Sequence, residues 1–225
     1  MITVHHLENS RSHRILWLLE ELGVAYEIKQ YARDPETRLA PQSLKDIHPL
    51  GKAPVITDDD IVVAESGAIT EYLMTKFSDG KLQPGDDPAA QRAYSYYMHY
   101  AEGTVMPLMI VGLLMSRIES AKLPFFVKPI AKGITGKVRE NYLNPNLSSN
   151  LAFMESTLAT SKWFTGDTLT AADIQMSFIA EGLNVNLDLE NDFPNLARFL
   201  KQCRDADGYK RAEERGGALT LGFSD

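Results

Sequence analysis

Two short segments in the first third of the chain combine residue types that can hold a small peptide. The first is Gly51-Lys52-Ala53-Pro54-Val55-Ile56, which offers a backbone edge beside a proline. The second begins nine residues later and is Glu65-Ser66-Gly67-Ala68-Ile69, which offers a carboxylate and a hydroxyl at the start of a helix. A carboxylate can pair with an ammonium group, and a hydroxyl at a helix N-terminus can hold a carboxylate. The two segments predict a peptide ligand that carries both groups.

The residues around these segments predict the elements that position them. Strand, helix, strand, a two-stranded hairpin and a closing helix are expected at residues 2–7, 14–22, 26–31, 55–57, 61–63 and 66–77. The first helix keeps apolar residues at helical spacing up to Gly23. A strand-helix-strand order predicts a parallel pair of strands, and Asp58-Asp59-Asp60 is typical of a hairpin turn.

A change in composition and in hydrophobic periodicity near residue 80 predicts two domains. Residues 81–88 are polar, contain two prolines and interrupt both periodicities, so they are expected to link an α/β domain at 1–80 to an all-helical domain at 89–225. Pro107 should kink or break the first helix of the second domain, and the tail after Gly216 should be loosely attached. Helices are expected at residues 89–118, 126–142, 145–161, 171–183 and 194–204.

Composition disfavours several classes of protein. The formal net charge of -7 argues against a nucleic-acid partner. The N-terminus lacks a signal-peptide pattern and the apolar run from Val105 to Met115 is too short to span a bilayer, so we expect a cytoplasmic protein with no membrane partner. A single cysteine, Cys203, excludes an internal disulfide or dithiol pair. His5 and His6 should face opposite sides of a strand, and no metal-binding motif appears.

A capping signal in the second domain completes a recognisable pattern. Thr170 and Asp173 are spaced for a reciprocal capping box at a helix start. This box, the Ser10 turn before Arg14-Ile15-Leu16-Trp17-Leu18-Leu19-Glu20-Glu21-Leu22-Gly23, the Gly51–Val55 segment and Glu65-Ser66 together resemble the glutathione S-transferase family in order and spacing. The resemblance covers nearly the whole chain. It implies a thioredoxin-like first domain, an all-helical second domain and a homodimer.

The resemblance also implies a role for each residue of the glutathione site. Pro54 would follow a cis bond that turns the edge of Ala53 toward the cysteinyl unit, whereas an isolated Ala-Pro would be an ordinary trans loop. Glu65 would pair with the γ-glutamyl ammonium and Ser66 would hold its carboxylate, although taken alone they would be a solvated end residue and a helix cap. Two cations would face the glycyl carboxylate or otherwise be surface residues: Lys52 and, by weaker similarity, Arg38.

The implied chemistry requires glutathione as a thiolate, because a free thiol with a pKa of about 8.5 is mostly protonated at neutral pH. Ser10 lies between the first strand and the first helix, where a hydroxyl and the positive helix end can favour the anion. Asn9 or Arg11 could be the donor instead, and Ser10 could be only a helix cap. This turn contains neither tyrosine nor cysteine. The tyrosine branches of the family and those that form a mixed disulfide are therefore disfavoured.

The function implied is a glutathione transferase that attacks apolar electrophiles, or peroxides in a variant reaction, with glutathione as co-substrate and no metal. Tyr97, Tyr100 and Met106 could line the electrophile pocket, or else simply pack between helices. A catalytically silent ligand carrier or protein-interaction domain is the alternative function. A glutathione-dependent reductase is disfavoured by the absent turn cysteine.

Overall fold

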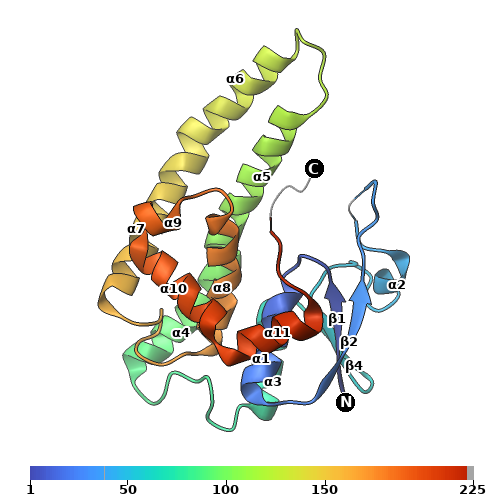
Figure 1. Cartoon of the computed structure of the whole chain (residues 1–225), viewed down its shortest axis with the longest axis vertical. Helices are drawn as coiled ribbons and strands as arrows, with labels where there is room; N and C mark the ends of the chain where they lie inside the picture. Colours follow the sequence, from blue (N-terminus) through green and yellow to red (C-terminus); the bar gives the residue numbers. More distant parts are fainter. Residues whose placement is uncertain (38, 222–225) are drawn as a thin grey trace.

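A four-stranded mixed sheet forms the first part of the chain in the computed structural model, which describes residues 1–37 and 39–221 (Figure 1). The strand order is β2 (Tyr26–Tyr31), β1 (Ile2–Leu7), β3 (Val55–Asp58) and β4 (Ile61–Ala64). β1 is parallel to β2 and antiparallel to β3, and β3 is antiparallel to β4. The predicted parallel pair and hairpin are therefore confirmed.

Helices cover both faces of this sheet. The helices α1 (Ser12–Leu22) and α3 (Ser66–Phe77) bury their apolar residues in a large core together with Val4 and Ile56. On the other face, the short helix α2 (Gln42–Lys45) contributes Leu44 to a small cluster with Leu7 and Tyr31. The alternation of side chains along β1 therefore serves two cores, which is why this strand is buried along nearly its whole length.

The helical domain begins with one continuous helix rather than an interrupted one. It consists of α4 (Pro88–Tyr100), the π-helical segment η1 (Ala101–Val105) and α5 (Met106–Ser120). Pro107 lies in the first turn after the π segment. A widened π turn leaves room for the proline ring, so the predicted break is a local change of helix type. Residues 78–87 connect α3 to this helix.

A second long helix also contains a π-helical segment followed by a proline. It consists of α6 (Lys128–Val138), η2 (Arg139–Leu143) and α7 (Asn144–Thr160), and Pro145 again lies in the first turn after the π segment. Two separate helices were expected over this stretch, and the structure shows one. The helices α5 and α6 together form a hairpin that projects away from the rest of the molecule (Figure 1).

The last four helices that the structure describes include two that join the domains, α8 and α11. The four are α8 (Ala171–Asn184), α9 (Leu189–Asp192), α10 (Pro194–Asp205) and α11 (Asp207–Gly216), of which the sequence analysis missed α9 and α11. The helix α8 starts with the predicted capping box and is buried on nearly all sides. On α11, the Tyr209 ring lies 4.8 Å from that of His13 and 5.3 Å from that of Trp17, both on α1. The first domain therefore packs against the C-terminal helix (Figure 1).

Candidate active site

The register of the sheet brings the three predicted site segments to one edge. His5 pairs with Val55, and Val55 pairs in turn with Ala64. The turn that follows β1 therefore lies next to the residues that precede β3, and these lie next to Glu65. Segments more than fifty residues apart in the sequence become neighbours through this pairing.

The segment before β3 presents an open peptide edge. The Ala53–Pro54 peptide bond is cis. Ala53 is half-buried and Lys52 is exposed. Within residues 1–37 and 39–221, the amide and carbonyl of Ala53 make no hydrogen bond, so this edge is free to pair with an extended peptide. Arg38, the other cation expected near this edge, lies outside the described residues.

The start of α3 combines an unusual backbone with a buried hydroxyl. Glu65 has φ of 73° and ψ of 131°, a conformation that non-glycine residues rarely adopt and that is often found at functional sites. Its side chain is exposed, whereas Ser66 is buried. The Ser66 hydroxyl accepts a hydrogen bond of 2.8 Å from Nη2 of Arg14. Because its oxygen is already a bonded acceptor, the Ser66 hydroxyl can direct its own proton at a ligand carboxylate.

Arg14 is part of a charged network that the sequence analysis did not identify. Its side chain is 1% exposed, donates to the carbonyl of Gln175 at 2.8 Å and forms an ion pair with Glu102 of η1. Nε of Arg11 lies 3.4 Å from the same carboxylate. Burial lowers the pKa of Arg14, while Glu102 acts in the opposite direction. The available signal was the position of Arg14 one turn before Leu18, on the face of α1 that is otherwise apolar.

The turn between β1 and α1 holds Ser10 in a network of hydroxyl groups. Ser10 is 6% exposed, and its Oγ lies 2.7 Å from the Leu7 carbonyl, to which it donates, and 2.7 Å from Oγ of Ser12. The backbone amide of Ser12 also donates to Ser10 Oγ, at 3.3 Å. Ser10 thus stands directly before the N-terminus of α1, where the amides and the helix dipole favour an anion.

Asn9, next to Ser10, is held by the end of the chain. It has φ of 48°, and its Oδ1 accepts a 2.9 Å hydrogen bond from the Thr220 amide. Leu219 and Leu221 also pack against the main core. The expectation of a loosely attached tail is therefore wrong for the described part, up to Leu221, because this segment returns to the turn that carries Ser10.

The residues expected along the electrophile pocket are packed inside the helical domain. Tyr97 and Tyr100 are buried, and their hydroxyls lie 3.1 Å from Oγ1 of Thr157 and 2.5 Å from Oδ1 of Asn150, both on α7. Met106 is also in the core. In the structure, these side chains pack helices together, which was the alternative reading of their spacing. Among residues 1–37 and 39–221, no group of His, Cys, Asp and Glu is arranged to hold a metal ion.

Comparison with known proteins agrees with this geometry. Models of the glutathione S-transferase N-terminal and C-terminal domains match residues 1–75 and 114–206. Glutathione S-transferase 3 of Schizosaccharomyces pombe is 34% identical, over 100% of this chain and 92% of its own length.

Solved structures share the fold. A glutathione S-transferase from Actinobacillus pleuropneumoniae is 34% identical with a TM-score of 0.74, over 97% of this chain and 94% of its own. A glutathione transferase homologue from Sulfitobacter, solved with bound glutathione, has a TM-score of 0.76 at 20% identity, over 97% of this chain and 99% of its own. Both domains, a full-length relative and the fold agree, and this chain belongs to the glutathione S-transferase family.

Proposed function

We propose that this chain transfers glutathione to apolar electrophiles, with Ser10 stabilising the thiolate. The observation that supports this most directly is the position of the Ser10 hydroxyl, at the N-terminus of α1 and on the same sheet edge as Ala53 and Glu65. A tripeptide whose cysteinyl unit pairs with Ala53 would extend its γ-glutamyl end toward Ser66 and its thiol toward the turn after β1.

The clamp at α3 suits the γ-glutamyl group. Glu65 is exposed and can pair with the ammonium, while the Ser66 hydroxyl and amide can bind the carboxylate. Arg14, which bonds Ser66 Oγ, fixes the hydroxyl and adds positive charge behind the carboxylate. Lys52 is the cation that faces the glycyl carboxylate, supported by its exposure next to Ala53. Arg14 therefore acts as a positioning residue for the clamp.

Stabilising the thiolate is the chemical task of the site. Lowering the thiol pKa by about two units requires about 2.7 kcal/mol of preference for the anion. A hydroxyl donor together with amides at a helix N-terminus can supply an effect of this size. To bond sulfur, Ser10 must turn its proton away from the Leu7 carbonyl, and only a rotation of its side chain is needed.

We also propose the class of the second substrate, the oligomeric state and the cellular location of the protein. We propose an apolar electrophile because α5 carries exposed apolar side chains such as Ile110. Glutathione-dependent peroxide reduction, a homodimer and a cytoplasmic location are proposed on the resemblance to the family. Each has a direct assay: peroxide turnover, light scattering after gel filtration, and cell fractionation.

Turnover of an aryl halide with glutathione tests the proposal, read together with retention on immobilised glutathione. Ser10→Ala should lower kcat/KM about a hundredfold, because about two units of thiol pKa are lost, and should keep retention. Ser177→Ala is the matched control, since Ser177 is a buried serine whose hydroxyl, within residues 1–37 and 39–221, bonds only the carbonyl of Ile174 in its own helix.

Three outcomes would change the assignment. A larger loss in Asn9→Ala or Arg11→Ala than in Ser10→Ala would move the donor role to that residue. Retention on glutathione by a parent protein that has no turnover would favour a ligand carrier. Failure of the parent protein to bind glutathione would overturn the site as a whole.

A further inference from the structure

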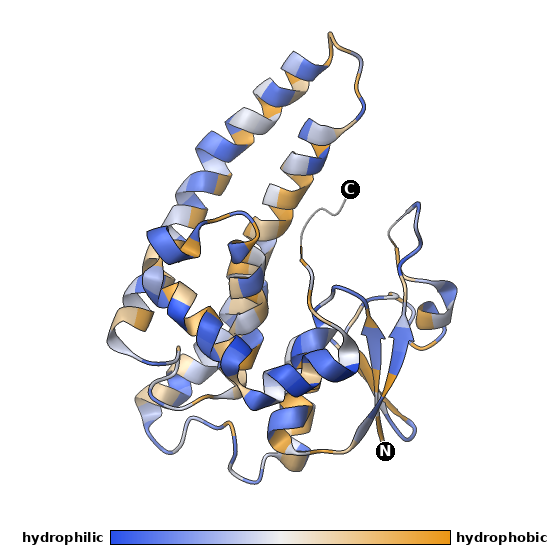
Figure 2. Ribbon diagram, in the orientation of Figure 1, coloured by the Kyte–Doolittle hydropathy of each residue, from blue (hydrophilic) through white to orange (hydrophobic). Residues whose placement is uncertain are grey.

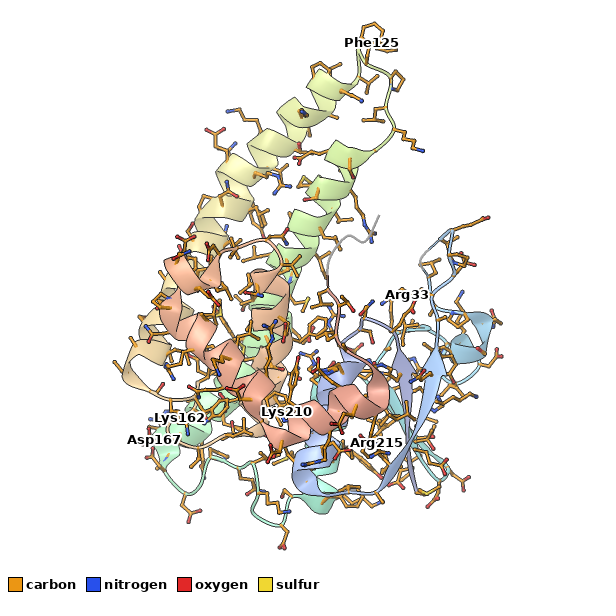
Figure 3. All side chains as sticks on the ribbon, viewed as in Figure 1. Arg33, Phe125, Lys162, Asp167, Lys210 and Arg215 are labelled. Atoms are coloured by element: carbon orange, nitrogen blue, oxygen red, sulfur yellow. The ribbon has the colours of Figure 1, made fainter. Side chains whose placement is uncertain are left out.

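The tip of the α5–α6 hairpin exposes large apolar side chains to solvent. Within the hairpin tip, defined as residues 121–138, Phe125 is 85% exposed, Phe126 is 65% exposed, and Ile130 and Ile134 are each 62% exposed. The exposed apolar surface continues down α5 through Ile118. Figure 2 shows apolar residues running along α5 into the tip, and Figure 3 places Phe125 at its extreme end.

The same tip is basic in an acidic protein. Residues 121–138 contain four lysines and no aspartate or glutamate, whereas the chain has a formal net charge of -7. All four lysines are exposed, namely Lys122, Lys128, Lys132 and Lys137. Among the residues that the structure describes, Lys122 and Lys128 form no ion pair with an acidic side chain. Lys137 pairs with Glu140, so the tip combines an uncovered apolar surface with positive charge that is unpaired, within the described part of the chain, at Lys122 and Lys128.

We propose that the hairpin tip docks this protein on an anionic lipid bilayer. Phenylalanine and isoleucine side chains can insert at the boundary between headgroups and acyl chains, and lysines can reach the phosphates with their ammonium groups. Each lysine near an anionic membrane surface adds to the attraction. The combination of charge with aromatic and aliphatic residues favours a lipid surface over an apolar protein partner. This inference does not depend on the proposed transferase activity.

Docking at the surface fits the fold, whereas spanning does not. The helix Pro88–Ser120 is long and apolar enough to cross a membrane by length and composition, and only 22% of its most apolar window is buried. However, Ala101, Val105 and Met106 belong to the core shared with α8, so this helix cannot leave the molecule. The expectation of no membrane partner rested on the length needed to span a bilayer, which peripheral docking does not require.

Cosedimentation of the full chain with vesicles tests the proposal. We expect binding to phosphatidylcholine vesicles that contain phosphatidylglycerol, little binding to phosphatidylcholine alone, and weaker binding as salt is added. Lys122→Glu/Lys128→Glu should lower the partition coefficient at least about tenfold. Lys162→Glu/Lys210→Glu makes the same change of charge at the opposite end of the molecule (Figure 3) and should bind like the parent.

A fluorescence measurement reports insertion of the tip itself. Phe126→Trp should show a blue shift when anionic vesicles are added, since the native Trp17 and Trp163 are buried and should not respond. Phe125→Ser/Phe126→Ser should lose vesicle binding and keep the unfolding midpoint of the parent, because both side chains are exposed.

The proposal is overturned if the parent does not bind anionic vesicles, or if both double charge variants lose binding equally. It is also overturned if Phe125→Ser/Phe126→Ser binds vesicles like the parent. In that case, a shift of this variant to a smaller assembly in gel filtration would assign the hairpin tip to contact with a second copy of the chain.

Discussion

The hydroxyl of Ser10 has a single proton, and the structure limits where it can go. Burial lowers the pKa of His6, so this imidazole is neutral near pH 7, and in the tautomer that carries its proton on Nε2 the Nδ1 atom is an acceptor. Ser12 Oγ lies 2.8 Å from Nδ1 of His6, and in this tautomer Ser12 is the donor. Ser12 then accepts a hydrogen bond from Ser10. The one proton of Ser10 can therefore bond the Leu7 carbonyl, Ser12 Oγ or a bound sulfur, but only one of them at a time.

Ser12 is therefore expected to support stability rather than chemistry. Its side chain is fully buried and cannot reach a ligand. Ser12→Ala should shift the pKa of bound glutathione, followed by thiolate absorbance, by less than about half a unit. The same variant leaves the buried Nδ1 of His6 without its hydrogen-bond partner, which should cost about 1–3 kcal/mol in urea unfolding. A thiol pKa that rises in Ser12→Ala as much as in Ser10→Ala would contradict this division of roles.

At the scale of elements, patterns confined to one segment were predictable from the sequence. The strand-helix-strand order, the hairpin and the start of α8 depend on spacing within a few residues. The extent of the first long helix was predicted, with a kink or break at Pro107, whereas the continuity of the second was not, because Pro145 was expected to begin a separate helix. In the structure each is accommodated after a π-helical turn, whose formation depends on packing of the whole helix.

The start of α8 makes a pH-dependent contribution to stability. Burial raises the pKa of Asp173 to about 6, although amides of Thr170 and Phe164 donate to its carboxylate at 2.9 and 2.8 Å. The native state therefore holds a proton on Asp173 at a pH where the unfolded chain, with a pKa of 3.8, has lost it. The unfolding free energy should fall as pH rises from about 4 to about 6.

Comparing the parent with Asp173→Asn isolates this effect, since the amide does not titrate. From about pH 4 to pH 7, the stability advantage of the parent over the variant should shrink by about 3 kcal/mol in urea unfolding. At all pH values the variant also directs an NH₂ group at backbone amides that are themselves donors, which lowers its stability independently of pH. If the advantage of the parent instead grows with pH, the hydrogen bonds to the Asp173 carboxylate lower its pKa by more than burial raises it.

At the scale of the whole molecule, the unpredicted parts of the site are those that join the domains. Ala53, Pro54 and Ser66 lie in local motifs and were identified from sequence. Arg14 meets Glu102, which is 88 residues away and follows the domain linker. Nothing in the spacing of either residue indicates the other, because their contact depends on how the helical domain packs against α1. Tyr209 on α11 contacts α1 across a still longer separation.

The Arg14–Glu102 pair should therefore contribute strongly to the stability of the domain interface. Glu102→Gln keeps the side-chain shape but leaves the charge of Arg14, which is 1% exposed, without its carboxylate, and should lower the unfolding free energy by about 3 kcal/mol. Glu140→Gln is the matched control, since its pair with Lys137 is exposed and should contribute less than about 1 kcal/mol. Urea unfolding followed by circular dichroism measures both. Equal small losses would mean that the carbonyl of Gln175 and water compensate Arg14, and that the interface depends on apolar packing alone.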